Sequence, residues 1–285
     1  MEEFLQNVGN WLLQLMVDWF GGNALYTIGV NIWNWAMTVC GAVATTTPDA
    51  FSTVAWTYTI NVVLDFTIAI GGTLLNVFYM VGIIRQSTNL KENFTLEIFV
   101  DNVIKMLLAN MLILNGLDLI KILFRLSAIS SGVFLIDNMP DIELLNQDVG
   151  SFLFNFIFGV VFLAVSIVCA FTIFLTLYNR YLQLYLLVAT YPLAMSTLPG
   201  GHGVYNTASS WVRTFLGKTF EIVIISMAVS IGSAMASSIN FGSITAGLGS
   251  AFDGAIHVIQ SMATMIIMTG AVKGVDGFMR RAFWL

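Results

Sequence analysis

Three long stretches of this chain contain no charged side chain, and they limit what it can fold into. They cover residues 149–179, 181–212 and 222–252. Each is longer than the roughly 20 residues that an α-helix needs to cross a hydrocarbon core of about 30 Å. Asp, Glu, Lys and Arg make up only 9% of the chain, against about a quarter of a soluble domain. The sequence therefore predicts an all-α fold, a polytopic transmembrane helical bundle.

Catalytic and metal chemistry has few candidate residues. The chain has two His and two Cys, and their positions match neither a zinc site nor a disulfide framework. Residues 217–219 read Gly-Lys-Thr, but a phosphate loop requires a glycine where this sequence has Val212. We therefore expect no catalytic residue, no metal and no cofactor, and a protein that is not an enzyme.

We expect one membrane domain over residues 1–285. Residues 1–20 separate apolar from polar side chains on two helical faces, which predicts an N-terminal amphipathic helix in the membrane interface. A helix packed on the protein's own core is the alternative. Candidate spans follow at 24–44, 56–84, 94–130, 149–179, 181–198, 218–240 and 254–274. The first is a weak candidate, because Asn31 and Asn34 lie near its middle.

Two of these segments are irregular. The uncharged core of 94–130 covers only residues 106–117, about 18 Å at 1.5 Å per residue, so we expect a protein-facing or broken helix pair there. Segment 181–198 contains Pro192 and ends at Pro199, Gly200 and Gly201, residues that interrupt helices. It is predicted either to be re-entrant or to cross the membrane.

The distribution of Lys and Arg favours one orientation. If the C-terminus is cytoplasmic and 181–198 does not cross, only Lys121 and Arg125 lie outside, with Lys105 left aside. If 181–198 crosses, Arg85 and Arg180 are among the cations that move outside. Short cytoplasmic loops carry the excess of cations in membrane proteins, so the first arrangement is favoured.

Charged residues in or beside the predicted spans are candidates for a polar pathway. They are Asp65, Lys105, Asp118, Lys121, Arg125 and Glu221. An ionised group at the bilayer centre costs about 2.5–3.5 kcal/mol, so such groups face protein or water. Glu221 follows Lys218 by three residues, and an ion pair near the interface satisfies both. Asp65 has no cation within a helical turn, so we expect it to face a cavity or a partner such as Lys105, Lys121 or Arg125.

Small residues recur every four positions on the helix that follows Lys218, and two more lie on the last span. They are Ser226, Ser230, Ala234 and Ser238 on one face, Ala228, Gly232 and Ala236 on another, and Gly270 and Gly274 on the last span. Small residues let helices approach closely in lipid, where no hydrophobic force drives helices together. Packing within one chain explains either face alone. Two such faces on one helix predict a homo-oligomer.

One part of the chain resembles a known family. It is the run Asn179-Arg180-Tyr181-Leu182-Gln183-Leu184-Tyr185-Leu186-Leu187-Val188-Ala189-Thr190-Tyr191-Pro192-Leu193-Ala194, followed by a glycine break, Trp211-Val212-Arg213 and a small-residue helix. In order and spacing, roughly the second half of the chain resembles the TrbL-like membrane subunit of conjugative type IV secretion systems, particularly the Gram-positive form. The N-terminal third is similar only in its general plan, an amphipathic start followed by spans.

The resemblance implies a multi-pass protein of the bacterial cytoplasmic (inner) membrane that helps to pass DNA out of a donor cell. Its partners would be membrane lipid, further copies of itself and other secretion subunits, including the secretion ATPase. Single-stranded DNA with its relaxase would be a passenger, and no small-molecule substrate is expected. The family supplies no catalytic residues, and from this sequence we expect no large soluble terminal domain of the kind found in longer relatives.

Two alternatives remain open from the sequence. A secondary transporter would show inverted repeats and paired broken helices near the midplane. Gly71-Gly72 and Pro192 are candidate breaks, but the chain has no matching halves. A small pore-forming or scaffold protein unrelated to secretion is the other alternative.

Overall fold

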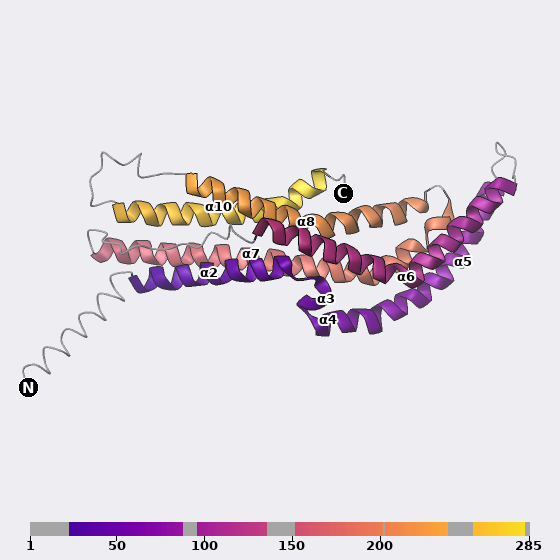
Figure 1. The fold of residues 1–285 in the computed structure, drawn as a ribbon, viewed down its shortest axis with the longest axis horizontal. Helices are drawn as coiled ribbons and strands as arrows, with labels where there is room; N and C mark the ends of the chain where they lie inside the picture. The colour runs from indigo at the N-terminus through magenta and orange to yellow at the C-terminus, as the bar shows by residue number, and fades with distance from the viewer. Residues whose placement is uncertain (1–22, 88–95, 136–151, 202, 239–252, 283–285) are drawn as a thin grey trace, which may run out of the picture. The chain divides into compact units, whose positions relative to one another are not determined.

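The structure is a computed structural model that describes residues 23–87, 96–135, 152–201, 203–238 and 253–282 (Figure 1). The expected interfacial helix over residues 1–20 lies outside the described residues. The described part is helical and contains no strand, which confirms the all-α prediction.

The described helices have the following bounds. They are α2 (Asn23–Thr45), α3 (Pro48–Phe51), α4 (Thr53–Tyr58), the π-helix η1 (Thr59–Leu64), α5 (Asp65–Ser87), α6 (Leu96–Leu135), α7 (Phe152–Met195), the 3-10 helix η2 (Leu198–Gly200), α8 (Tyr205–Ser238) and α10 (Asp253–Ala282).

Five described segments are long and apolar enough to cross a membrane. They are Thr53–Arg85, Phe99–Phe134, Phe156–Met195, Tyr205–Met235 and His257–Ala282. They overlap the predicted spans 56–84, 94–130, 149–179, 218–240 and 254–274, which makes the chain a multi-pass membrane protein. The weak candidate at 24–44 forms helix α2 but is not among the five.

The expected break in 94–130 is wrong, because α6 is one helix of 40 residues. Charged side chains interrupt an apolar run without interrupting a helix. Lys105 and Asp101, one turn apart on α6, form an ion pair at 2.5 Å, of the kind that supports helices.

The expected boundary at residue 180 is also wrong. Helix α7 is continuous from Phe152 to Met195, so 181–195 prolongs the preceding span and does not turn back. Pro192 lies in the last turn of α7, where its missing amide removes one hydrogen bond of the helix, and α7 continues to Met195. The helix ends there, and the amide of Ser196 donates to the carbonyl of Pro192 (3.0 Å).

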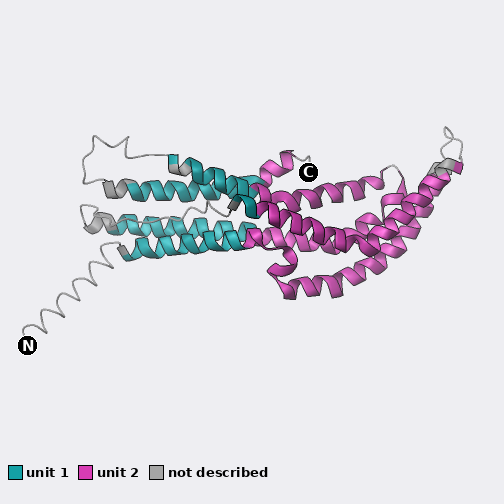
Figure 2. Cartoon of the chain, in the orientation of Figure 1, with its two compact units in different colours: residues 1–42, 132–177, 225–275 teal, residues 43–131, 178–224, 276–285 magenta. Residues whose placement is uncertain are grey.

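The chain divides into two compact units, and helices α2, α6, α7, α8 and α10 each contribute residues to both (Figure 2). Unit 1 comprises residues 1–42, 132–177 and 225–275. In it, α2 approaches α7 closely, because a Cβ added at Gly29 would lie 2.8 Å from the ring of Phe162. The hydroxyl of Ser166 donates to the carbonyl of Gly29, and Tyr26 packs edge-on against Phe162.

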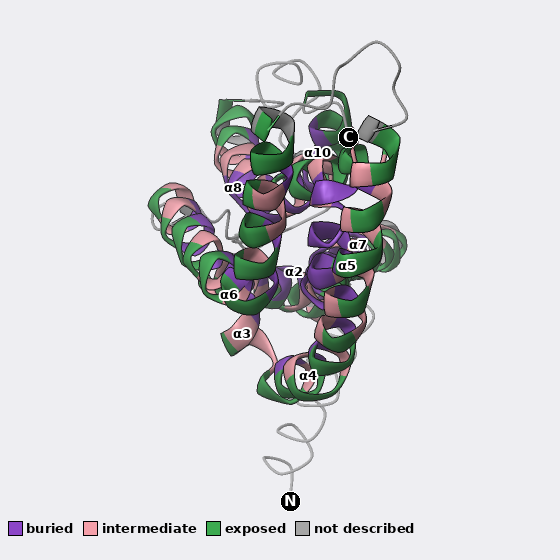
Figure 3. Cartoon of the chain, turned by 90° about the vertical axis from the view of Figure 1, so that its right-hand side faces the viewer, coloured by how far each residue is buried: buried purple, intermediate pink, exposed green. Residues whose placement is uncertain are grey.

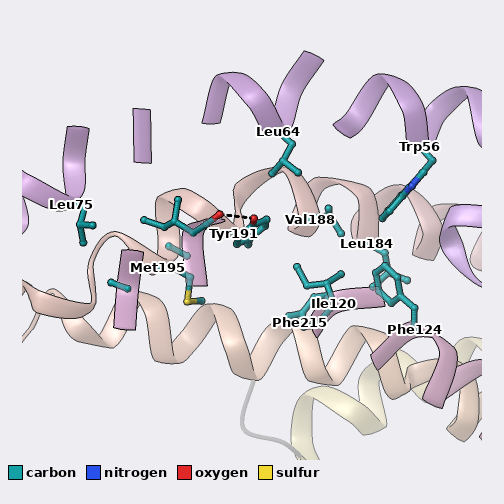
Figure 4. Close-up of a cluster of buried hydrophobic side chains, with 13 residues drawn as sticks. Trp56, Leu64, Leu75, Ile120, Phe124, Leu184, Val188, Tyr191, Met195 and Phe215 are labelled. Atoms are coloured by element: carbon teal, nitrogen blue, oxygen red, sulfur yellow. Dashed lines mark hydrogen bonds between the residues drawn. The ribbon is translucent and has the colours of Figure 1, made fainter. Parts of the chain in front are cut away.

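Unit 2 comprises residues 43–131, 178–224 and 276–285. Its core forms on one face of α7, where Leu184, Val188, Tyr191 and Met195 follow the spacing of a helix stripe (Figure 4). Facing them are buried side chains of the other segments, namely Trp56, Leu64, Leu75, Ile113, Ile120, Phe124 and Phe215. In lipid such a cluster is stabilised chiefly by close packing and dispersion.

Close backbone contacts join α5 to the end of α7 in unit 2. A Cβ added at Gly71 would lie 2.9 Å from the carbonyl oxygen of Pro192. Further along, Gly82 lies against the backbone of Pro199 and Gly200. The turn after α7 therefore packs on the C-terminal part of α5.

Candidate functional site

Arg180 is buried at the junction of α7 and α8 in unit 2. Only 4% of the residue is exposed. Its Nε donates to the carbonyl of Lys218 (3.3 Å) and its Nη2 to the carbonyl of Thr219 (3.2 Å). The guanidinium also lies 5.3 Å from the centre of the Tyr181 ring. Arg180 therefore bonds α7 to α8 through its planar fork, which suits two neighbouring acceptors.

Beside this contact, Lys218 binds two carboxylates. Its Nζ lies 3.0 Å from Oε2 of Glu221 and 2.5 Å from Oδ1 of Asp276. Asp276 also binds Arg280 at 3.0 Å. The pair of Lys218 with Glu221 was predicted from their spacing and is confirmed. Asp276 was missed, because it lies on α10 and nothing local to Lys218 points to it.

We call these five side chains the charge clasp: Arg180, Lys218, Glu221, Asp276 and Arg280. Glu221 is 4% exposed, and its Oε2 has the ion pair with Lys218 but no hydrogen bond. A buried ion pair whose partner is removed costs about 3–5 kcal/mol. The clasp can therefore lock α7, α8 and α10 together, and it offers no nucleophile and base in mutual contact.

Three tyrosines of α7 continue the same pattern. Tyr181 donates to the carbonyls of Val43 (2.6 Å) and Thr46 (2.9 Å). Tyr185 donates to the carbonyl of Pro48 (2.8 Å). Tyr191 donates to the carbonyl of Ile113 on α6 (2.8 Å; Figure 4). The polar groups of this half of α7 thus hold other segments by their backbones.

The structure does not bring the six predicted pathway residues together. Glu221 belongs to the charge clasp, and Lys105 pairs with Asp101. Asp65, Asp118 and Arg125 are exposed and Lys121 is half-buried. Among the described residues, Asp65 forms no ion pair with Lys105, Lys121 or Arg125.

The small-residue faces are used partly within the chain. Ser226 is fully buried, and Ser230 donates to the carbonyl of Phe134 (2.6 Å). A Cβ added at Gly232 would lie 2.7 Å from the sulfur of Met268 on α10. By contrast, Ala234 and Ser238 are exposed, and a Cβ added at Gly270 or Gly274 would meet nothing within 4 Å. The side chain of Ala236 lies outside the described residues.

The predicted break residues lie at the end of α7. Pro192 is in the last helical turn, Pro199 and Gly200 are buried in η2, and Gly201 has a φ of 77°, which glycine adopts at little cost. This turn lies near the end of α5, since a Cβ added at Gly203 would lie 3.9 Å from Nη1 of Arg85.

An apolar groove lies beside Tyr191 in unit 2. Its volume is about 150 Å³, and its lining includes Gly116, Tyr191, Met195, Trp211 and Phe215. The indole nitrogen of Trp211 is buried without a hydrogen-bond partner in the described part of the chain. This groove suits an apolar chain better than a polar substrate.

Within the described residues no three His, Cys, Asp or Glu side chains are placed to hold a metal. Cys40 and Cys169 are buried and unpaired. In comparisons with known proteins, the chain matches no protein-family model, no curated protein and no solved structure.

Proposed function

We propose that this chain is a non-enzymatic membrane subunit of a bacterial type IV secretion machine that moves a DNA–protein substrate across the cytoplasmic membrane. One observation carries the proposal. The stretch that resembles TrbL-like subunits is also the stretch whose polar side chains tie unit 2 together. Arg180, Tyr181, Tyr185 and Tyr191 each donate to a backbone carbonyl of another segment. Polar side chains that hold segments of the fold together, and take no part in a reaction, suit a channel or scaffold subunit.

The proposed partners follow from that role. Several copies would stand in the membrane with other secretion subunits, including the secretion ATPase, and single-stranded DNA with its relaxase would pass as cargo. The proposed orientation has a cytoplasmic C-terminus. It is supported by the contact between Arg85 and the turn at Gly203, because the arrangement that the cations favour puts both on one side.

A mating assay tests the proposal. Deleting the gene in a donor that carries the conjugative element should abolish transfer, and the wild-type chain supplied in trans should restore it. A variant with Arg180→Ala, checked for membrane insertion, should restore transfer poorly, whereas Arg213→Ala, at an exposed residue of α8, should restore it fully. Undiminished transfer from the deletion strain would contradict the proposed function.

A secondary transporter is the second candidate, and one observation favours it. Asp65 is exposed and immediately follows the π-helix η1 within a candidate span, and π-helical turns are frequent at functional sites. Vesicles containing only this protein would then accumulate a solute when an ion gradient is imposed to drive uptake, and Asp65→Asn would abolish that uptake. Vesicles that take up nothing above empty controls would remove this candidate.

A further inference from the structure

Asp118 cannot avoid the membrane if α6 spans it. The span Phe99–Phe134 has 36 residues, and a crossing helix uses about 20 of them. Any 20 consecutive residues within this span start at residue 115 or earlier and end at residue 118 or later. Every crossing by this helix therefore includes Asp118.

Asp118 belongs to a charged face of α6. Lys121 and Arg125 follow it at spacings of three and seven, which place all three on one side of a helix. Many residues of α6 are exposed (Figure 3). Asp118 and Arg125 are exposed and Lys121 is half-buried. None of them forms an ion pair with any residue that the structure describes. Because each such charge costs about 2.5–3.5 kcal/mol at the bilayer centre, this face is unsuited to lipid.

Asp65 on α5 is the complementary charge. It is exposed and forms no ion pair with a described residue. The α6 face has one carboxylate and two cations, and Asp65 supplies the second carboxylate. Asp65 on α5 and the face of α6 formed by Asp118, Lys121 and Arg125 therefore sum to zero charge.

Asp65 and Lys121 also lie at similar heights in unit 2. On α7, the adjacent residues Tyr191 and Pro192 contact Gly116 and Gly71 respectively. Trp56 lies before Asp65 in the sequence, Phe124 lies after Lys121, and the two rings pack on each other. The chain that precedes Gly71 and the chain that follows Gly116 therefore run in the same direction from α7 residues 191 and 192. Asp65 is six residues before Gly71 and Lys121 is five residues after Gly116, displacements of about 9 and 8 Å at 1.5 Å per residue.

We propose that the charged face of α6 is covered by α5 of a second copy of this chain. Asp65 of one copy then pairs with Lys121 and Arg125 of its neighbour, at matching depth and in the same membrane orientation. Because this contact joins two different faces, each copy can bind a further copy in the same way. The copies form a closed ring when the rotation that relates neighbouring copies divides a full turn evenly. The inference deepens the proposed function by naming the surface through which the subunits assemble, and it rests on that function only in requiring several copies.

Cysteine cross-linking in native membranes tests the contact. Two differently tagged full-length chains, both carrying Cys40→Ala and Cys169→Ala, are co-expressed with Asp65→Cys in one and Lys121→Cys in the other. Oxidation should give a disulfide-linked heterodimer. Ile104→Cys is the matched control, because Ile104 is exposed on the same helix about 25 Å from Lys121 at 1.5 Å per residue. No heterodimer, or a predominant pair of two Lys121→Cys chains, would overturn the proposal.

Charge exchange gives an independent measurement. Asp65→Lys alone and Lys121→Asp alone should each reduce the oligomer fraction, measured by mass after mild detergent extraction. The double variant should restore it. If the double variant restores nothing, and cysteines at both positions react with a membrane-impermeant thiol reagent, the face lines water and the proposed contact is refuted. Cross-linking together with normal mating in the deletion strain would reject the secretion function and leave the contact standing.

Discussion

Arg180 is buried without a carboxylate at ion-pair distance in the described part of the chain, and it bonds two peptide carbonyls of α8 instead. A helix carbonyl that accepts its usual amide bond still has a second lone pair. A guanidinium can therefore satisfy its charge on the outside of a helix without breaking that helix. Lys218, with two carboxylates around it, represents the other solution, in which opposite charges meet directly.

Arg180→Lys should destabilise the protein although it keeps the charge. An ammonium cannot reproduce the two-pronged contact with the carbonyls of Lys218 and Thr219, and a hydrogen bond from a charged donor contributes about 1.5–3 kcal/mol. The melting temperature in detergent should fall. Arg213→Lys at an exposed position is the control and should leave it unchanged. Equal melting temperatures for both variants would contradict the role of Arg180.

Lys218→Met should be more damaging than Glu221→Gln. The first change leaves the buried Glu221 carboxylate without its cation, at a cost of about 3–5 kcal/mol, whereas the second leaves Lys218 paired with Asp276. Adding Glu221→Gln to Lys218→Met should recover part of the loss. Thermal unfolding of the purified variants measures the order, with Lys273→Met, at an exposed lysine, as the reference. A double variant no more stable than Lys218→Met would argue against a coupled pair.

At the scale of elements, α5 and α7 pack by backbone approach as well as by side chains. Gly71 lies against Pro192 at the end of α7, and Gly82 lies against the turn that follows. Because Gly71 has no Cβ, the backbone of α5 can come close to the carbonyl of Pro192. This contact fixes where the turn after α7 lies on α5.

Gly71→Ala and Gly72→Ala form a matched pair that tests this packing. A Cβ at Gly71 would lie 2.9 Å from the Pro192 carbonyl oxygen, whereas one at Gly72 would meet nothing within 4 Å. Gly71→Ala should lower the melting temperature and the yield of folded protein. Gly72→Ala should be neutral or stabilising, since alanine favours a helix over glycine by about 1 kcal/mol. The opposite order would show that α5 and α7 are not in this contact.

For the whole molecule, the continuity of α7 constrains the topology. A single helix from Phe152 to Met195 cannot reverse, and the turn that follows it lies beside Arg85 at the end of α5. Residues near 85 and near 203 therefore share one side of the membrane. This removes the arrangement in which 181–198 returns as a separate crossing.

Reporter fusions test that topology. A phosphatase that is active only outside the cytoplasm, fused after Arg85, Asp141, Gly203 or Gly247, should be active after Asp141 and Gly247 and inactive after Arg85 and Gly203. The pattern follows from one crossing by each of the helices α6, α7 and α8. Activity after Gly203 but not after Arg85 would refute the single crossing of α7.

The sequence by itself determined the class of the fold, because a chain so poor in charge must place long apolar helices in lipid and satisfy its backbone within them. It also predicted the pair of Lys218 and Glu221, whose spacing is local. It misplaced the ends of the helices at Arg180 and within 94–130, because a charged side chain marks a polar position and does not end a helix. Only the tertiary structure decided that Arg180 bonds α8, that Asp276 joins Lys218, and that Asp65 stands apart from Lys121 within one chain. Those outcomes depend on residues distant in sequence, whose proximity no local pattern encodes.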